Sequence, residues 1–536
     1  MPKFESRSKV CVRWWPVSII LVLTALAIGL IWNLDISHRQ EQVMLTILAV
    51  GVLFMMMLLW LLFLSRLRLK IRLVAFVVIA LFSLLSVAVF RIRGVSGDFL
   101  PLLEWRWSRR VSKSLIASPG ATSRTLDKAS SVSPHDYPQF LGPNRNATVH
   151  SIKLARDWSA RPPRLMWRQP IGAGWSAFAV VGNSAVTQEQ NGEYEMVVCY
   201  DLKSGRVKWS HRDHDKYEST IAGDGPRATP TIVVDRIYTT GGTGILNCLE
   251  LATGQQIWSQ DILYDNNAEM SPWGMSCSPL VMDGLVIVSA GGPAGRSLVA
   301  YHAATGERIW SGGDAPSGYS SPVFTTLAGV PQILIFNYGN VAAHDPGTGQ
   351  ILWQHSWPQT ECVSQPVPLL GDRVFVSTGY GIGCKLFQIQ RSGYRYPDGI
   401  RTQRNLQVSL IWETRRLKAK LTNIVYRDGY IYGLDDGVLV CLDIVDGQRK
   451  WKRGRYGHGQ VILIDPPDET EALSRLLLVQ AELGDIVLVE VNPNAPKELA
   501  RFAALDSKTW NNPALAGPYL LVRNDREAAC YELPLE

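Results

Sequence analysis

The 536-residue sequence lacks the short motifs by which many proteins bind nucleotides or zinc. It contains no P-loop, no glycine-rich dinucleotide fingerprint, and no cysteine and histidine spacing typical of a zinc site. It also lacks a basic stripe with interleaved aromatic residues. These absences argue against a nucleotide-dependent enzyme, a zinc protein and a nucleic-acid-binding protein.

Charge is sparse and unevenly placed. Charged residues make up 19% of the chain, and the formal net charge is +7. Residues 1–112 hold 14 Lys and Arg against 5 Asp and Glu, a balance of +9, so the remaining 40 basic and 42 acidic residues give −2. The basic surplus therefore belongs to the N-terminal part of the chain, and the rest is nearly neutral. We expect no nucleic-acid partner.

One pattern recurs five times: a glycine at the end of a turn is followed four residues later by tryptophan. Tryptophan accounts for 18 of 536 residues, so five matches in one register do not arise from composition. A repeat at this spacing indicates a solenoid, a propeller or an array. The pairs are Gly205 and Trp209, Gly254 and Trp258, Gly306 and Trp310, Gly349 and Trp353, and Gly447 and Trp451.

Each copy has the residues of a β-hairpin. In the first, an apolar run at 196–200 leads into a turn, and a second run ends at Trp209. Asp201 can accept backbone N–H bonds within the turn, and Gly205 supplies the positive φ that closes it. The tryptophan is expected to wedge between neighbouring sheets while its N–H donates to a carbonyl. One hairpin cannot bury both of its faces, so the copies must stack.

The glycine spacing gives the number of units. Successive gaps are 49, 52, 43 and 98 residues, and the last is twice 49, so one repeat has lost its turn. An insertion at about 391–405 interrupts that repeat. The strands of this repeat are expected at 373–377, 384–389 and 410–412. Those of the two sets that follow are expected at 476–479, 485–490, 519–522 and 528–531. The count is then eight units of four strands.

The two ends of this array complement each other. The eighth unit has only three strands before residue 536, and a strand expected at 164–168 has no other partner. Pairing the two closes a ring and removes the open edges of a linear array. We therefore predict an all-β eight-bladed β-propeller of four-stranded antiparallel blades, preceded by three transmembrane α-helices. The propeller domain is expected to cover residues 136–536.

This turn-and-tryptophan repeat resembles the pyrroloquinoline-quinone-type (PQQ-like) repeat. The family includes quinoprotein dehydrogenases and the BamB-like outer-membrane assembly lipoproteins, and the resemblance covers the C-terminal two-thirds of the chain. If the chain resembles the quinoproteins of this family, the resemblance implies a quinone held between a tryptophan and a ring formed by two adjacent cysteines. It also implies a calcium ion bound by Glu, Asn and Asp side chains. Trp273 or Trp510 would suit the tryptophan, but no two cysteines are adjacent here. The chain also lacks the lipobox cysteine of a BamB-like lipoprotein, since Cys11 precedes the first span.

The eight cysteines do not indicate a disulfide framework. Equivalent points on neighbouring blades are expected to lie beyond the roughly 7 Å Cα separation that a disulfide tolerates. Four cysteines occupy such equivalent positions, where we expect small buried side chains: Cys199, Cys248, Cys441 and Cys530. Cys277 and Cys362 lie near the start of inner strands, where both a disulfide and a role in a site stay open.

Three N-terminal stretches are long and apolar enough to cross a bilayer, which takes about 20 residues. They lie at about 14–34, 43–65 and 73–90. Because two further spans follow the first directly, and no small-residue cleavage site is obvious, we expect an anchor and not a cleaved signal peptide. Residues 1–95 are then the membrane anchor, and 96–135 form a juxtamembrane segment and flexible linker.

The basic residues predict the orientation of these spans. The N-terminal tail and the second loop are rich in Lys and Arg, which places both in the cytoplasm: Lys3, Arg7, Lys9, Arg13, Arg66, Arg68, Lys70 and Arg72. Three crossings put the propeller on the periplasmic side of a bacterial inner membrane. A set after the third span argues mildly the other way: Arg91, Arg93, Arg106, Arg109 and Arg110.

Propellers bind ligands around the central channel and at its mouth. Aligned by blade, the residues just before each inner strand form a ring of large polar and aromatic side chains: Trp175, Arg227, Trp273, Tyr319, Gln365, Lys420, His458 and Trp510. Such a ring would suit a flat aromatic or acidic ligand. The alternative is that these side chains plug the channel or brace its loops. The sequence places no Ser or Asp partner for His458, so no catalytic residue is predicted.

Two functions follow as hypotheses. The first is a membrane-anchored, BamB-like binding or scaffold module without a cofactor, which holds a protein or envelope ligand at the propeller face. The second is a membrane-bound PQQ-dependent alcohol or sugar dehydrogenase that uses PQQ with Ca²⁺. The missing cysteine pair and missing metal carboxylates favour the first.

Overall fold

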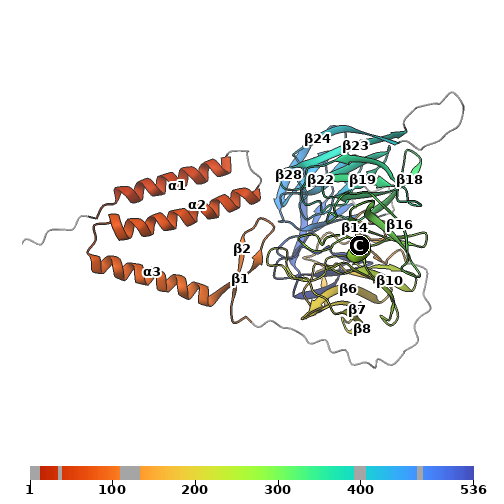
Figure 1. The fold of residues 1–536 in the computed structure, drawn as a ribbon, viewed down its shortest axis with the longest axis horizontal. Coiled ribbons are helices and arrows are strands. Elements are labelled where there is room, and N and C mark those ends of the chain that lie inside the picture. The colour runs from red at the N-terminus through yellow and green to blue at the C-terminus, as the bar shows by residue number, and fades with distance from the viewer. Residues whose placement is uncertain (1–11, 34–38, 109–132, 392–405, 467–474) are drawn as a thin grey trace, which may run out of the picture. The chain divides into compact units, whose positions relative to one another are not determined.

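The computed structural model describes residues 12–33, 39–108, 133–391, 406–466 and 475–536. The chain divides into two compact units, Met1–Arg110 and Val111–Glu536 (Figure 1). Residues 109–132 of the predicted juxtamembrane segment and linker, and residues 392–405 of the insertion, lie outside the described residues. So do Lys3, Arg7, Lys9, Cys11, Arg109 and Arg110.

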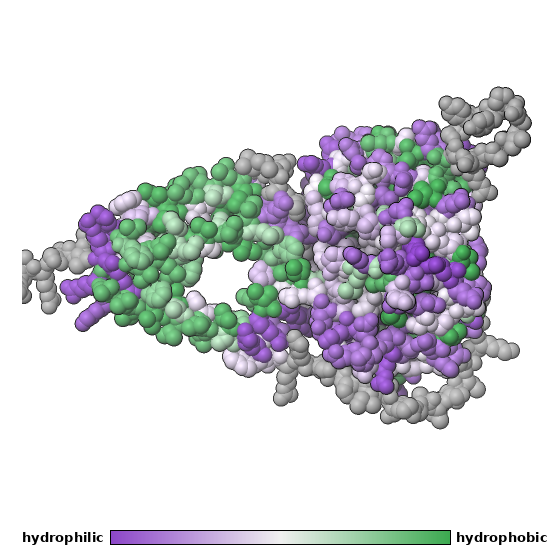
Figure 2. All heavy atoms as spheres, viewed as in Figure 1, coloured by the Kyte–Doolittle hydropathy of each residue, from purple (hydrophilic) through white to green (hydrophobic). Residues whose placement is uncertain are grey.

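The first unit contains three helices and a hairpin: α1 (Trp15–Asn33), α2 (Arg39–Leu59) with the π-helical turn η1 (Trp60–Leu64), α3 (Leu69–Val89), β1 (Phe90–Val95) and β2 (Pro101–Trp105). Each helix is long and apolar enough to span a membrane. Hydrophobic residues cover the helices in Figure 2. The rings of Trp14 and Trp60 lie 5.6 Å apart, and Trp32 Nε1 donates to Thr46 Oγ1 at 3.1 Å, so α1 and α2 run antiparallel.

The second unit is a ring of eight antiparallel sheets, which confirms the predicted propeller. Blades 1 and 2 consist of β5 (Ala179–Val181), β6 (Ser184–Asn191), β7 (Tyr194–Asp201), β8 (Val207–Asp213), β9 (Thr231–Val233), β10 (Arg236–Thr240), β11 (Ile245–Glu250) and β12 (Gln256–Asp261), with the short helix α4 (Ile262–Asn266) following β12. Blades 3 and 4 consist of β13 (Leu280–Met282), β14 (Leu285–Gly292), β15 (Arg296–His302), β16 (Arg308–Gly312), β17 (Val323–Leu327), β18 (Val330–Asn337), β19 (Asn340–His344) and β20 (Ile351–Ser356).

The remaining blades follow the same order. Blades 5 and 6 consist of β21 (Val367–Leu369), β22 (Arg373–Thr378), β23 (Gly383–Arg391), β24 (Leu406–Thr414), β25 (Val425–Arg427), β26 (Tyr430–Asp435), β27 (Val438–Asp443) and β28 (Arg449–Arg455). Blade 7 consists of β29 (Gln460–Ile464), β30 (Leu476–Gln480), β31 (Asp485–Glu490) and β32 (Lys497–Ala503). Blade 8 consists of β33 (Ala514–Ala516), β34 (Tyr519–Arg523), β35 (Glu527–Glu532) and β4 (Arg164–Pro170).

Ring closure occurs where the sequence predicts it. β4 pairs antiparallel with β35, with Trp167 opposite Cys530, so the start of the domain completes the last blade. First strands of neighbouring blades contact one another, for example β5 with both β9 and β33, and these strands therefore surround the central axis.

With the exception of Trp353, the repeat tryptophans join one blade to the next. The Trp209 indole donates to the Leu251 carbonyl at 2.9 Å and packs on Gly254, the turn glycine of the following blade. Trp167, Trp258, Trp310 and Trp412 do the same with the turns of their own following blades. The wedge and its carbonyl partner are therefore as predicted.

Blade 5 explains the one exception. Its sequence has an insertion where the repeat turn would receive Trp353. The Trp353 indole instead donates to Gln332 Oε1 of its own blade at 2.6 Å. The gap of 98 residues between turn glycines thus has a direct structural consequence.

The cysteines of the described residues are all free and buried. Cys199, Cys248, Cys441 and Cys530 each lie opposite the tryptophan of their own blade, as their shared register predicts. Cys277 and Cys362 form no disulfide. Cys277 Sγ accepts from the Ser289 backbone N–H, and Cys362 Sγ donates to the Thr360 carbonyl.

The segment before the propeller follows the inner strands. Tyr137 forms a bridge with Val180 of blade 1, and β3 (Thr148–Val149) adds a parallel strand to β29 of blade 7. Between them, Arg145 enters the ring of blades. Blade 7 therefore has five strands, one more than the repeat predicts.

Candidate functional site

Under the predicted ring lies a belt of hydrogen bonds from blade to blade. Thr229 N donates to Ser278 Oγ at 2.9 Å, and Ser278 N donates to Ser321 Oγ at 2.9 Å. Farther round, Gln365 N donates to Asn423 Oδ1 at 3.3 Å, and Asn423 N donates to Gln460 Oε1 at 3.3 Å. The small polar residues that open the inner strands therefore join neighbouring blades. The belt therefore fixes the predicted ring residues, which lie next to it in the sequence.

Two tryptophans and a lysine form the first part of the ring. The rings of Trp175 and Trp510 have centroids 5.0 Å apart. Lys508 Nζ lies 4.0 Å from the Trp510 centroid and 4.8 Å from the Trp175 centroid. Trp175 and Lys508 are buried, and Trp510 is half-buried. A cation on these aromatic faces is stabilised by the ring quadrupole.

Glu482 joins Trp510 to His458. Its Oε1 accepts from Trp510 Nε1 at 2.9 Å, and its Oε2 accepts from the His458 backbone N–H at 3.0 Å. Both His458 and Glu482 are buried. The carboxylate thus braces two of the predicted ring residues.

A second aromatic cluster comes from blades 3 to 5. Trp273 and Tyr319 stack with centroids 5.1 Å apart, and Tyr319 Oη accepts from the Trp273 backbone N–H at 3.1 Å. Tyr380 lies 6.4 Å from Trp273, and Lys420 Nζ lies 5.1 Å from the Tyr380 centroid. Burial raises the pKa of Tyr319 above its ordinary value. Its hydroxyl therefore stays neutral near pH 7.

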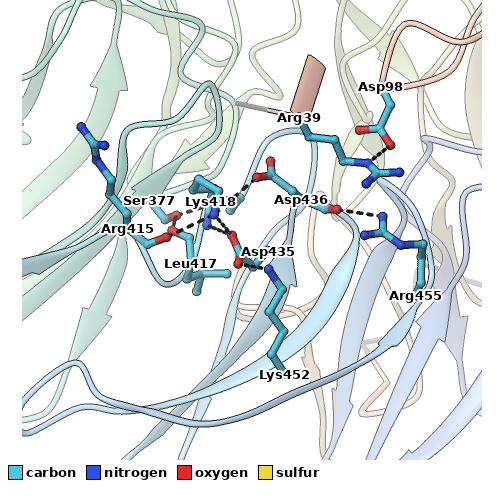
Figure 3. Close-up of polar contacts among 11 residues, drawn as sticks. Arg39, Asp98, Ser377, Arg415, Leu417, Lys418, Asp435, Asp436, Lys452 and Arg455 are labelled. Carbon is cyan, nitrogen blue, oxygen red and sulfur yellow. Dashed lines mark hydrogen bonds and ion pairs between the residues drawn. The ribbon is translucent and has the colours of Figure 1, made fainter. Parts of the chain in front are cut away.

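The Lys420 segment is fixed by a charge cluster (Figure 3). Asp435 is almost fully buried and pairs with Lys418 Nζ at 2.6 Å and with Lys452. Lys418 also donates to Asp435 through its backbone N–H at 2.9 Å. Although burial lowers the pKa of Lys418, its two acidic neighbours raise it more, so the net pKa lies above the ordinary value. The connection from β24 to β25, which carries Lys420, is thereby held in place.

Arg227 lies between the two aromatic clusters. Its guanidinium is 4.3 Å from the Tyr217 centroid and donates to the carbonyls of Gly223, at 2.6 Å, and Gly225. Burial lowers its pKa to about 10, and the charges of Tyr217 and Glu195 oppose that shift. Arg227 therefore keeps its positive charge near pH 7.

Gln365 contacts Arg145, in the segment that precedes the blades. It is buried, and its Nε2 donates to the Arg145 carbonyl at 2.6 Å. The Arg145 guanidinium donates to the carbonyls of Ser278, Pro279 and Pro322 at 3.0–3.1 Å. Burial lowers the pKa of Arg145 to about 10. Arg145 and Gln365 thus lie buried among the inner strands, beside the polar belt.

The eight predicted residues therefore divide into three groups. Trp175, His458 and Trp510 belong with Lys508 and Glu482; Trp273, Tyr319 and Lys420 belong with Tyr380; Arg227 and Gln365 stand apart from both. Four of the eight are half-buried, and can still reach a ligand: Arg227, Trp273, Tyr319 and Trp510.

Sequence reasoning missed five residues of this arrangement. Three of them lie in connections of unequal length: Lys508, Tyr217 and Tyr380. Glu195 lies near the start of β7, and Glu482 lies just after the end of β30. Only Lys508 had a usable signal, since it stands two residues before Trp510. The others become neighbours of the ring through the fold alone.

Glu195 carries an unusual protonation state. It is buried and accepts from the Gly242 backbone N–H at 2.9 Å. Burial raises its pKa from 4.5 to about 7, while the Gly242 bond and Arg227 oppose that shift. The carboxyl group therefore takes up a proton near neutral pH.

We predict that the propeller becomes less stable as the pH rises, because the folded chain holds the Glu195 proton more tightly than the unfolded chain does. Between pH 4.5 and about 7 the folded chain keeps a proton that the unfolded chain has released, so the free energy of unfolding falls by about 3 kcal/mol over this window. Glu195→Gln should remove that slope. Urea midpoints of the full chain in detergent at pH 5 and pH 7 measure it, and a variant that keeps the wild-type slope would contradict the assignment.

The residues around the mouth do not reproduce the calcium-quinone site that the family resemblance implies. Within the described parts of the chain, no three His, Cys, Asp or Glu side chains gather closely enough to hold a metal ion. One face of Trp273 is stacked on Tyr319, and Glu482 is engaged by Trp510 and His458.

Comparison with known proteins agrees with the fold. Residues 193–453, just under half of the chain, match the family described as outer membrane protein assembly factor BamB. BamB from Moraxella catarrhalis is 13% identical over 69% of this chain and 98% of its own, with a TM-score of 0.48. No curated protein sequence matches this chain.

Quinoproteins are structural neighbours as well. A quinohemoprotein alcohol dehydrogenase from Pseudomonas putida HK5 is 12% identical over 75% of this chain and 81% of its own, with a TM-score of 0.50. The corresponding enzyme from Comamonas testosteroni is 12% identical over 74% and 80%, with a TM-score of 0.47. At 12% identity, the likeness to the Pseudomonas putida enzyme shows the fold alone.

Proposed function

We propose that this PQQ-like propeller protein is a binding or scaffold module, anchored in a membrane by α1, α2 and α3. One observation carries the proposal: the buried carboxylates near the mouth are engaged by the propeller itself, while aromatic and basic side chains remain half-exposed. Glu195 accepts from Gly242 and Glu482 accepts from Trp510. General acid–base chemistry needs a group that reaches a substrate proton, and these two carboxylates are held by internal partners.

The mouth favours a ligand with acidic and flat groups. Trp273, Tyr319 and Trp510 offer aromatic surface that is half-exposed, and Arg227 adds a guanidinium among them. The buried Lys508 and Lys420 contribute positive charge beside the Trp510 and Tyr380 rings. Arg and aromatic residues are enriched at the energetic centres of protein interfaces. A protein or other envelope ligand with an acidic segment fits this chemistry.

We further propose that the propeller faces the periplasm from a bacterial inner membrane. The basic second loop supports this orientation. Of the arginines after α3, which argue the other way, Arg91 pairs with Glu104 at 2.9 Å, and Arg106 donates to the Val87 carbonyl at 2.9 Å. Arg109 and Arg110 lie outside the described residues.

A cofactor titration separates this proposal from the dehydrogenase alternative. The full chain in nanodiscs is titrated with PQQ and Ca²⁺ while tryptophan fluorescence and dye-linked alcohol oxidation are followed. We expect no calcium-dependent turnover. Stoichiometric quenching with turnover would instead make the protein a quinoprotein and overturn the proposal.

Site-specific photocrosslinking tests binding directly. We expect p-benzoylphenylalanine in place of Tyr319 to capture a partner in living cells, and Arg227→Ala to reduce that product. Val445 provides the matched control, because its side chain is 75% exposed in the turn between β27 and β28, away from the inner strands. Equal capture at both positions would contradict a specific role for the mouth.

A further inference from the structure

The first unit ends in a β-hairpin that starts where α3 stops. α3 ends at Val89 and β1 begins at Phe90, with no connecting loop. The chain turns back where Ser96 N donates to the Leu100 carbonyl at 2.9 Å, and β2 then pairs antiparallel with β1. The hairpin therefore begins at the C-terminal end of a candidate membrane span.

The hairpin has one apolar and one charged face. Phe90 lies opposite Trp105, and Ile92 lies opposite Leu103, so these four side chains share a face. The Phe90 and Trp105 rings have centroids 4.8 Å apart, and Ile92 and Leu103 are 61% and 64% exposed. We call Phe90, Ile92, Leu103 and Trp105 the apolar face.

The opposite face carries an ion pair. Arg91 lies opposite Glu104 and pairs with it at 2.9 Å. An amphipathic element of this kind binds at a membrane surface, with its apolar side about 5–10 Å inside the headgroup boundary. The same exposed surface in water would be unfavourable.

Two arginines hold the hairpin to helix ends. Arg106 donates through its backbone N–H to the Val89 carbonyl at 2.9 Å, and through Nε to the Val87 carbonyl at 2.9 Å. Arg39, at the start of α2, donates to Asp98 in the hairpin turn at 2.7 Å (Figure 3). The hairpin is thus tied to the ends of two candidate spans, α2 and α3, on the same side.

We propose that the β1–β2 hairpin is embedded in the bilayer interface, with its apolar face in lipid. The inference rests on the membrane anchor of the proposed function. Direct continuity with α3 selects lipid as the occupant, because the exposed apolar surface of that helix runs on into the hairpin. Trp105 and Trp107, 56% and 70% exposed, are of the residue type enriched at membrane interfaces.

An environment-sensitive label tests this placement in the full chain. Leu103→Cys and Glu104→Cys are neighbours in β2 that point to opposite faces. Each variant also carries Cys11→Ser, so that the introduced cysteine is the one labelled, since the seven described cysteines are buried. The protein is labelled with a nitrobenzoxadiazole probe. It is then reconstituted in phosphatidylcholine vesicles with or without brominated acyl chains. We expect bromine quenching to be roughly threefold stronger at Leu103→Cys, given an apolar face inside the headgroup boundary.

Two results would overturn the proposal. Equal, weak quenching with water-like emission at both positions would place the hairpin in solvent. Blue-shifted emission at Leu103→Cys without bromine quenching would mean that protein covers the face. An alkaline carbonate wash distinguishes these failures from failure of the anchor: protein that remains in the membrane keeps its spans whatever the hairpin does, and protein that is released has no anchor.

Discussion

Replacing Gly254 by alanine is expected to lower the free energy of unfolding by roughly 3 to 5 kcal/mol. Gly254 adopts a φ of +73°, and a Cβ there would lie 2.3 Å from Cε3 of Trp209. The indole cannot retreat without cost, because its Nε1 donates to the Leu251 carbonyl at 2.9 Å. The substitution therefore separates blade 1 from blade 2 at their shared contact.

Gly284→Ala is the matched control. Gly284 has nearly the same φ, +76°, but a Cβ there would meet no atom within 4 Å. Its substitution costs only the left-handed backbone strain, about 1–2 kcal/mol. Urea unfolding of the full chain in detergent, followed by tryptophan fluorescence, measures both variants. Equal losses would mean that backbone conformation alone explains the repeat glycine.

This pair of glycines also shows why the fold was readable from the sequence. The turn glycine and the tryptophan of the neighbouring blade are one contact repeated around the ring, so the same residues recur at nearly constant spacing. Blade 5 supports this explanation, because the loss of its turn coincides with a different partner for Trp353. The closing strand was predictable for a related reason: an unpaired strand edge is unfavourable.

The mouth was less predictable because its contacts are not repeated. Trp175 and Trp510 meet because blade 8 adjoins blade 1, which the ring does predict. Their contact with Lys508, and that of Arg227 with Tyr217, depend on the paths of individual connections between blades. Nothing in the register of the repeat specifies those paths. Candidate positions could therefore be found by alignment of blades, while their pairings required the structure.

The last prediction concerns the junction between the last blade and the first. Arg523, in β34 of blade 8, is fully buried and donates to Thr187 Oγ1 at 2.7 Å and to the Gln188 carbonyl at 2.6 Å, both in blade 1. It also donates to the carbonyls of Gly172 and Gly174, each at 3.2 Å. Burial lowers its pKa to about 10, so the guanidinium remains charged near pH 7.

Arg523→Ala should lower the free energy of unfolding by roughly 4 kcal/mol, because each buried acceptor left without a donor costs about 1–3 kcal/mol. Arg523→Lys should recover only part of the loss, since an ammonium cannot match the planar fork that reaches several carbonyls. Arg453→Ala, on an exposed position of β28, should change stability by less than about 0.5 kcal/mol.

Hydrogen exchange shows whether the lost stability belongs to ring closure. If Arg523 holds blade 8 against blade 1, amides of β4 and β35 should exchange faster in Arg523→Ala while those of blade 3 keep their protection under native conditions. Uniform acceleration in all blades would contradict a local role at the junction. Because β4 is the strand that completes the ring, opening at Arg523 is expected to expose the edge of β35, which the closed propeller protects by pairing the start of the domain with its end.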